Sequence, residues 1–136
     1  MTANSYSEFD SFCLANQHRL TRIAVHRFGL EVILSLREYV PQLLIDFAAK
    51  RKKQIVAQED EHIVLSWRLA CWAFVAKREP ETSIEVAFAR ALICFLFPIA
   101  DAPEPILLID DFLMFMEMTG DFESTLMSLR YLLLEE

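Results

Sequence analysis

The chain has 136 residues, of which 54% are hydrophobic, and its formal net charge is −7. This length suits one domain, and we expect residues 1–136 to form a single helical domain. Mean hydropathy of +0.28 excludes an intrinsically disordered chain. With only two glycines, Gly29 and Gly120, the sequence also excludes a turn-rich sheet and a glycine-rich loop that binds nucleotide phosphates.

Helical periodicity and helix-ending residues predict seven helices. The first begins at Ser7 and is expected to end at Gly29. The second covers Leu30–Tyr39 and stops before Pro41, because proline disfavours helical geometry in the residue that precedes it. Pro41 can begin the third helix, where its missing N–H has no helical partner to lose.

The fourth predicted helix spans roughly 61–78 after a cap at Asp60, and it is apolar almost all the way round. That pattern predicts burial on most sides. Thr82 or Ser83 is expected to cap the fifth helix, which runs from Ile84 to about Phe97.

Three prolines between Pro98 and Pro105 mark the clearest break in the chain. The sixth helix follows from Ile106 to Met118, and Gly120 ends it. Asp121 is expected to cap the seventh.

These elements predict an all-α fold, a compact bundle of six or seven helices in orthogonal or irregular packing, without a sheet. We expect the fourth, fifth and sixth helices to form its centre. No segment has the roughly 18 charge-poor apolar residues that a membrane-spanning helix needs. The expected core anchors are Trp67, Trp72, Phe88, Phe95 and Phe112.

The three cysteines, Cys13, Cys71 and Cys94, are odd in number and lie among apolar neighbours. We therefore expect buried free thiols and a reducing, cytoplasmic compartment. The first eleven residues are polar and carry acidic rather than basic side chains, so no secretory signal is expected.

Charge changes along the chain. Residues 1–57 hold eight basic and five acidic side chains, whereas residues 100–136 hold one basic and nine acidic ones. A basic face is expected on the first and third helices, yet a pI near 5.0 disfavours nucleic acid as the partner. The acidic end favours a basic protein partner. The residues of the basic face are His18, Arg22, His26, Lys50, Arg51, Lys52 and Lys53.

Candidate sites for chemistry are few. Glu59 and His62 have the Glu-x-x-His spacing of one metal-binding helical turn, but a di-metal bundle needs that pair twice, and no second pair occurs. We therefore expect no metal, no cofactor and no catalytic motif. On the sixth helix, acidic residues beside methionine and phenylalanine are typical of an adaptable binding surface or of plain core. These residues are Asp110, Asp111, Met114, Phe115 and Met118.

Residues 90–112 resemble the YkvA-like bacterial domain of unknown function. The resemblance rests on Pro98-Ile99, on Pro103 and on the Asp110-Asp111 pair. The chain departs from that pattern at Ala100, where the family has aspartate, and in a shorter stretch without glycine before the acidic pair. The resemblance implies a short helical protein that associates with membranes and has no established activity.

The apolar surplus suggests that something covers part of the surface. Our leading hypothesis is a non-enzymatic adaptor, regulatory or immunity-type protein, a homodimer, that acts through an apolar patch flanked by acidic residues. One alternative is a small-molecule binder or enzyme with a pocket between helices. Another is peripheral attachment to a membrane surface.

Overall fold

The computed structural model describes residues 6–57, 61–78 and 83–135, and within these ranges the chain forms α-helices and short 3-10 turns but no strand. This confirms the all-α prediction. The α-helices are α1 Ser7–Ala15, α2 Arg22–Ser35, α3 Gln42–Ala57, α4 Ile63–Ala76, α5 Ile84–Ile93, α6 Pro105–Thr119 and α7 Glu123–Leu129. The 3-10 turns are Gln17–Arg19, Ile99–Asp101 and Arg130–Leu134.

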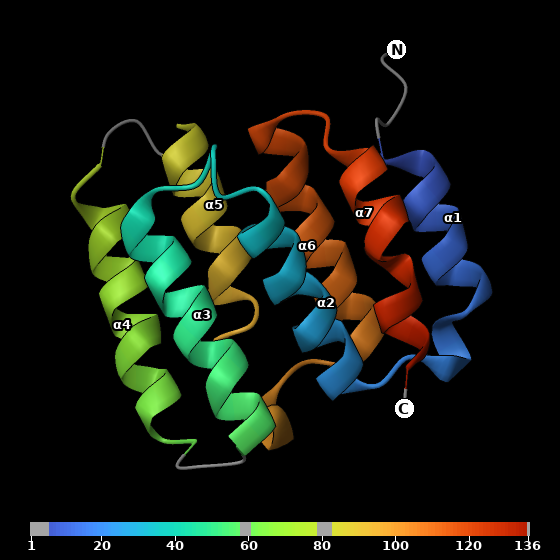
Figure 1. Cartoon of the computed structure of the whole chain (residues 1–136), viewed down its shortest axis with the longest axis horizontal. Helices are drawn as coiled ribbons and strands as arrows, with labels where there is room; N and C mark the ends of the chain where they lie inside the picture. Colours follow the sequence, from blue (N-terminus) through green and yellow to red (C-terminus); the bar gives the residue numbers. More distant parts are fainter. Residues whose placement is uncertain (1–5, 58–60, 79–82, 136) are drawn as a thin grey trace.

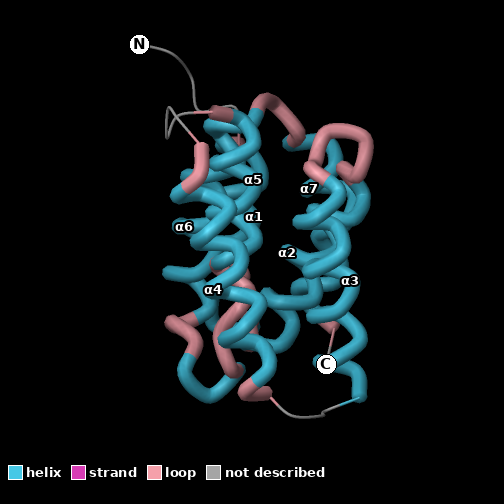
Figure 2. Tube along the Cα trace, turned by 90° about the vertical axis from the view of Figure 1, so that its left-hand side faces the viewer, coloured by secondary structure: helices cyan, strands magenta, loops and turns pink. Residues whose placement is uncertain are grey.

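The helices form a bundle of two uneven layers. Figure 2 shows α4, α5 and α6 on one side and α2, α3 and α7 on the other. In Figure 1, α4 lies at one end of the bundle and α1 at the opposite end, where α1 packs against α7 and α6. Helix α5 packs most extensively against α6 and α4. The labelled helices run roughly alongside one another in Figure 1, which is not an orthogonal arrangement.

The first two helices differ from the prediction. The first ends after Ala15, and α2 runs straight through Gly29. Thr21 starts α2, because its side-chain oxygen accepts a hydrogen bond from the Ala24 amide at 3.2 Å. Gly29 ends no helix: a Cβ there would lie 2.0 Å from Cζ of Phe95, so its missing side chain makes room for that ring. The predicted second helix is therefore largely the second half of α2.

The prediction that the fourth helix is buried on most sides is also wrong. Helix α4 buries one narrow face, consisting of Val64, Cys71 and Phe74. Trp72, an expected core anchor, is 39% exposed, and Trp67 is only partly buried. The reason is position: α4 lies at the edge of the bundle, so its other faces have no helix to cover them.

Helices α2, α5 and α6 occupy the centre instead. Rings from α2, from α6 and from the segment just after α5 lie edge-on: Phe112 is 6.3 Å from Phe28 and 5.0 Å from Phe95 between centroids. Phe9 extends this row by stacking on Phe28 at 5.2 Å. Burial of Phe88, Phe95 and Phe112 agrees with the sequence-based core.

Local signals at several helix ends are confirmed. The Ser83 hydroxyl accepts a hydrogen bond from the Val86 amide at 3.2 Å, so Ser83 caps α5 as expected. Helix α6 begins at Pro105, one residue before the predicted start at Ile106. Gly120 ends α6 with φ of 146°, a conformation that favours glycine.

Candidate functional site

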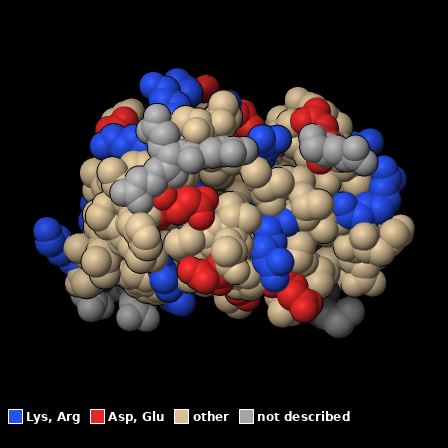
Figure 3. Space-filling model, turned by 90° about the horizontal axis from the view of Figure 1, so that it is seen from below, with Lys and Arg blue, Asp and Glu red and all other residues tan. Residues whose placement is uncertain are grey.

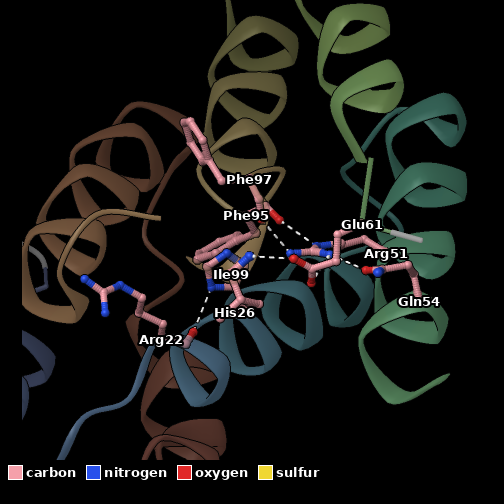
Figure 4. Close-up of polar contacts among 8 residues, drawn as sticks. All are labelled: Arg22, His26, Arg51, Gln54, Glu61, Phe95, Phe97 and Ile99. Carbon is pink, nitrogen blue, oxygen red and sulfur yellow. Dashed lines mark hydrogen bonds and ion pairs between the residues drawn. The ribbon is translucent and has the colours of Figure 1, made fainter. Parts of the chain in front are cut away.

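A buried polar cluster surrounds Arg51 on α3 (Figure 4). Its Nε donates to the carbonyl of Phe95 at 3.0 Å, and Nη2 donates to the carbonyl of Phe97 at 2.6 Å. Nη1 donates to the side-chain oxygen of Gln54 and lies 3.8 Å from Glu61. The two carbonyls follow the end of α5, where helices leave carbonyl groups without helical partners and favour a cation. We call Arg51, its two carbonyl acceptors, Gln54 and Glu61 the clamp, because these contacts join α3 to the segment that follows α5.

His26 lies beside the clamp on α2 with no exposed surface (Figure 4). Its Nδ1 donates to the carbonyl of Arg22 at 2.7 Å, which leaves Nε2 as an acceptor without a partner among the described residues. The ring meets Phe95 edge-on at 5.6 Å. Burial is the main cause that lowers the pKa of His26 to about 4; the charge of Arg51 acts in the same direction, and the hydrogen bond to Arg22 opposes both. His26 is thus a neutral core residue.

These positions correct the predicted basic face. The predicted first helix is interrupted between α1 and α2. His18 therefore lies in a 3-10 turn, and His26 lies on α2 in the core. Arg22 donates from Nε to the carbonyl of Ala102 at 3.0 Å. Arg51 is also buried, so it belongs to the clamp and contributes nothing to the surface.

The remaining basic side chains of α3, Lys50, Lys52 and Lys53, are exposed. Lys52 forms an ion pair with Glu31, and Lys52 and Lys53 line a shallow groove beside Val56. Seen from below, Lys and Arg side chains lie in separate groups with Asp and Glu between them (Figure 3). This view shows no continuous basic surface.

Helices α4 and α6 both expose apolar side chains. On α4, Leu65, Leu69 and Trp72 follow helical spacing and are 40%, 71% and 39% exposed. On α6, exposed apolar side chains lie on the side that carries Met114. We call this surface the α4–α6 face and define it as Leu65, Leu69, Trp72, Leu107, Met114 and Met118.

A pocket of about 310 Å³ lies between α4 and α6 with α5 as its floor. We call it the α5 pocket. Arg68 and Trp72 line both this pocket and a neighbouring depression bounded by Leu65 and Leu69, so the pocket opens within the α4–α6 face. The pocket is lined by Arg68, Trp72, Arg90, Ile93, Cys94, Phe97, Pro103, Leu108, Asp111, Met114 and Phe115.

Two arginines and Asp111 are the charged side chains that line the α5 pocket. The guanidinium carbon of Arg68 lies 4.0 Å from the ring centroid of Phe97, and that of Arg90 lies 4.7 Å from the ring centroid of Phe115. Nε of each arginine is buried and has no hydrogen-bond partner among the described residues. Within the described residues the two guanidinium groups contact aromatic rings and form no ion pair with a carboxylate.

The predicted binding residues of α6 divide between two sides of that helix. Asp111, Met114 and Phe115 line the α5 pocket, where Phe115 is a nearly buried wall. Asp110 faces away: partial burial raises its pKa, and the negative charges of Asp10 and Asp111 raise it further. Adjacent residues point about 100° apart on a helix, so this pair does not converge. Met118 lies on the α4–α6 face outside the pocket.

No group of three His, Cys, Asp or Glu side chains in the described part of the chain is placed to hold a metal ion. Of the weak metal pair, His62 is exposed and Glu59 lies outside the described residues, as does Asp60. No helix within the described ranges has both the length and the apolar character to cross a membrane.

All three cysteines are buried free thiols, as expected. Cys94 reaches the α5 pocket, and burial raises its pKa to about 12, with a further contribution from Asp111. The thiolate form is the nucleophile, so Cys94 is a neutral part of the pocket wall.

Four residues of the α4–α6 face and the α5 pocket were not predicted from the sequence. Arg68, Arg90, Leu65 and Leu69 lie on helices predicted to be buried, and nothing distinguished them there. One signal was present: Arg68 interrupts an otherwise apolar helix, and a charge among apolar side chains is costly unless it is paired.

Comparison of the chain with protein-family models, with curated proteins and with solved structures finds no match. The resemblance of residues 90–112 to the YkvA-like domain stays a prediction.

Proposed function

We propose that the chain is a non-enzymatic interaction module that pairs with a second copy of itself through the α4–α6 face. The observation that supports this is the exposed apolar stripe of α4. Leu69 is 71% exposed in the middle of that stripe. Contiguous apolar surface of this kind marks an interaction site in soluble proteins.

The charges of the face favour a second copy as the partner. Arg68 on α4 and Asp111 on α6 lie on opposite sides of the groove, and neither forms an ion pair within the described residues. A two-fold interface uses the same patch on both subunits. Arg68 of one subunit therefore meets Asp111 of the partner subunit, and each charge that lacks an ion pair finds the opposite sign.

The dimer is tested by placing a charge in the stripe. Leu69→Glu should raise the dissociation constant of the dimer by at least roughly tenfold, since burying an unpaired carboxylate is unfavourable by more than about 1.4 kcal/mol. Val56→Glu is the matched control, because Val56 is 69% exposed on α3, away from the face. Sedimentation equilibrium from micromolar to millimolar concentration measures both.

A charge exchange tests the orientation of the two subunits. Arg68→Asp and Asp111→Arg should each weaken the dimer, and the double variant should restore it. A wild-type chain that stays monomeric up to millimolar concentration would contradict the proposal. If such a monomer bound a different protein through Leu69, the chain would instead be an adaptor, regulatory or immunity-type protein.

A further inference from the structure

We infer that the α5 pocket binds a small organic acid, an apolar body that carries one carboxylate. This inference goes beyond pairing of the chain with itself, and the two proposals share Arg68. The stripe of α4 points outward, whereas the acid would occupy the floor of the groove on α5.

The strongest argument is the pair of buried donors without acceptors. Nε of Arg68 and Nε of Arg90 are both out of contact with water and bond to nothing in the described chain. Buried polar groups in proteins almost always have a hydrogen-bond partner, and each exception calls for an explanation. Both arginines line one pocket, so two cationic side chains lie beside a single volume.

Aromatic rings lie beside both guanidinium groups. Phe97 lies under Arg68, and Phe115 and Trp72 lie under Arg90 at 4.7 Å and 5.7 Å from its Cζ. Stacking occupies the face of a guanidinium and leaves its N–H groups at the edge. A carboxylate matches that edge, because its two oxygens accept two parallel N–H bonds.

The rest of the pocket defines the body of the acid. Ile93, Leu108 and Met114 supply apolar walls. A volume of about 310 Å³ is at the lower end of the range for small-molecule sites. Asp111 at the rim adds a negative charge, which disfavours a second anionic group on the ligand. These features favour a monocarboxylate over a phosphate ester or a diacid.

The test compares probes that differ in the head group alone. We expect octanoate to bind the full chain at least roughly tenfold more tightly than octanol or octylammonium. This factor corresponds to the free energy of hydrogen bonds to a charged group. Titration calorimetry measures each affinity. Hydrocinnamate tests the same head group on an aromatic body.

Substitutions then assign the head group to the arginines. Arg68→Met and Arg90→Met should each weaken octanoate at least roughly tenfold and leave octanol unchanged. Arg130→Met is the matched control, because Arg130 also lies over an aromatic ring, that of Phe12, but outside the pocket. Arg90→Lys keeps the charge without the planar fork and should give an intermediate loss, which covers the case in which Arg90→Met does not fold.

Every titration is repeated in the Leu69→Glu chain, since Leu69 does not line the α5 pocket. Unchanged octanoate binding there separates this inference from the dimer. The inference is wrong if neither octanoate nor hydrocinnamate binds, if octanol binds as tightly as octanoate, or if both Arg→Met variants keep wild-type affinity.

Discussion

Arg51 was predicted to lie on an exposed basic face, but it is buried. It stands in a run of four basic residues, yet its guanidinium is completely buried and holds the carbonyls of Phe95 and Phe97. Burial lowers the pKa of Arg51, and Glu61 opposes that effect. Because Glu61 is 38% exposed and 3.8 Å away, the carbonyl bonds matter more than the ion pair.

We therefore expect Arg51→Met to lower the free energy of unfolding by about 3–5 kcal/mol, since it leaves buried carbonyls without donors. Arg51→Lys should fall between wild type and Arg51→Met, because an ammonium cannot donate from a fork. Lys53→Met, an exposed change on the same helix, should have little effect. Urea denaturation measures all three. Equal stability of Arg51→Met and Lys53→Met would disprove the clamp.

At the scale of the element, α4 shows why composition alone does not determine burial. Its sequence is apolar on nearly every side, but neighbours cover only the face with Val64, Cys71 and Phe74. The uncovered apolar residues, which include Leu69 and Trp72, are available to a partner.

The two aromatic residues Trp72 and Phe112 provide a direct comparison. Phe112→Ala removes a fully buried ring from α6 and should cost about 3–5 kcal/mol. Trp72→Ala removes a ring that is 39% exposed, so its cost to the monomer should be about 1 kcal/mol. Thermal and urea unfolding of the two variants at low concentration checks the order. A reversed order would place α4 in the core after all.

At the scale of the whole molecule, stability should depend on pH through His26. Its pKa is about 4 in the folded chain and 6.5 ordinarily, so between these values the unfolded chain binds the proton and the folded chain does not. Protonation of His26 therefore leaves the free energy of unfolding unchanged above pH 6.5 and lowers it as the pH drops toward 4. The loss is at most about 3 kcal/mol. The raised pKa of Asp110 acts in the opposite sense, but Asp110 is exposed.

Urea denaturation at several pH values tests this dependence. His26→Gln, which stays neutral throughout, should flatten the profile between pH 6.5 and 4. His18→Gln is the control at an exposed position and should follow the wild type. An unchanged slope in His26→Gln would show that His26 gains its proton in the folded chain as readily as in the unfolded one.

Local signals in the sequence were sufficient for the helical class and for several helix ends. Ser83 and Gly120 act on the backbone within a few residues, so their effect does not depend on the rest of the fold. Gly29 misled the prediction, since its missing Cβ makes room for Phe95, a residue 66 positions away in the chain.

The sequence by itself determined that this protein is a bundle of amphipathic and apolar helices with buried thiols, because helical spacing, capping and hydrophobicity are properties of neighbouring residues. Only the tertiary structure decided which of those helices is central. Whether a side chain is covered depends on the elements packed around it. That is why His26 and Arg51 lie in the core, while the stripe of α4 and the two stacked arginines of the α5 pocket remain available for binding.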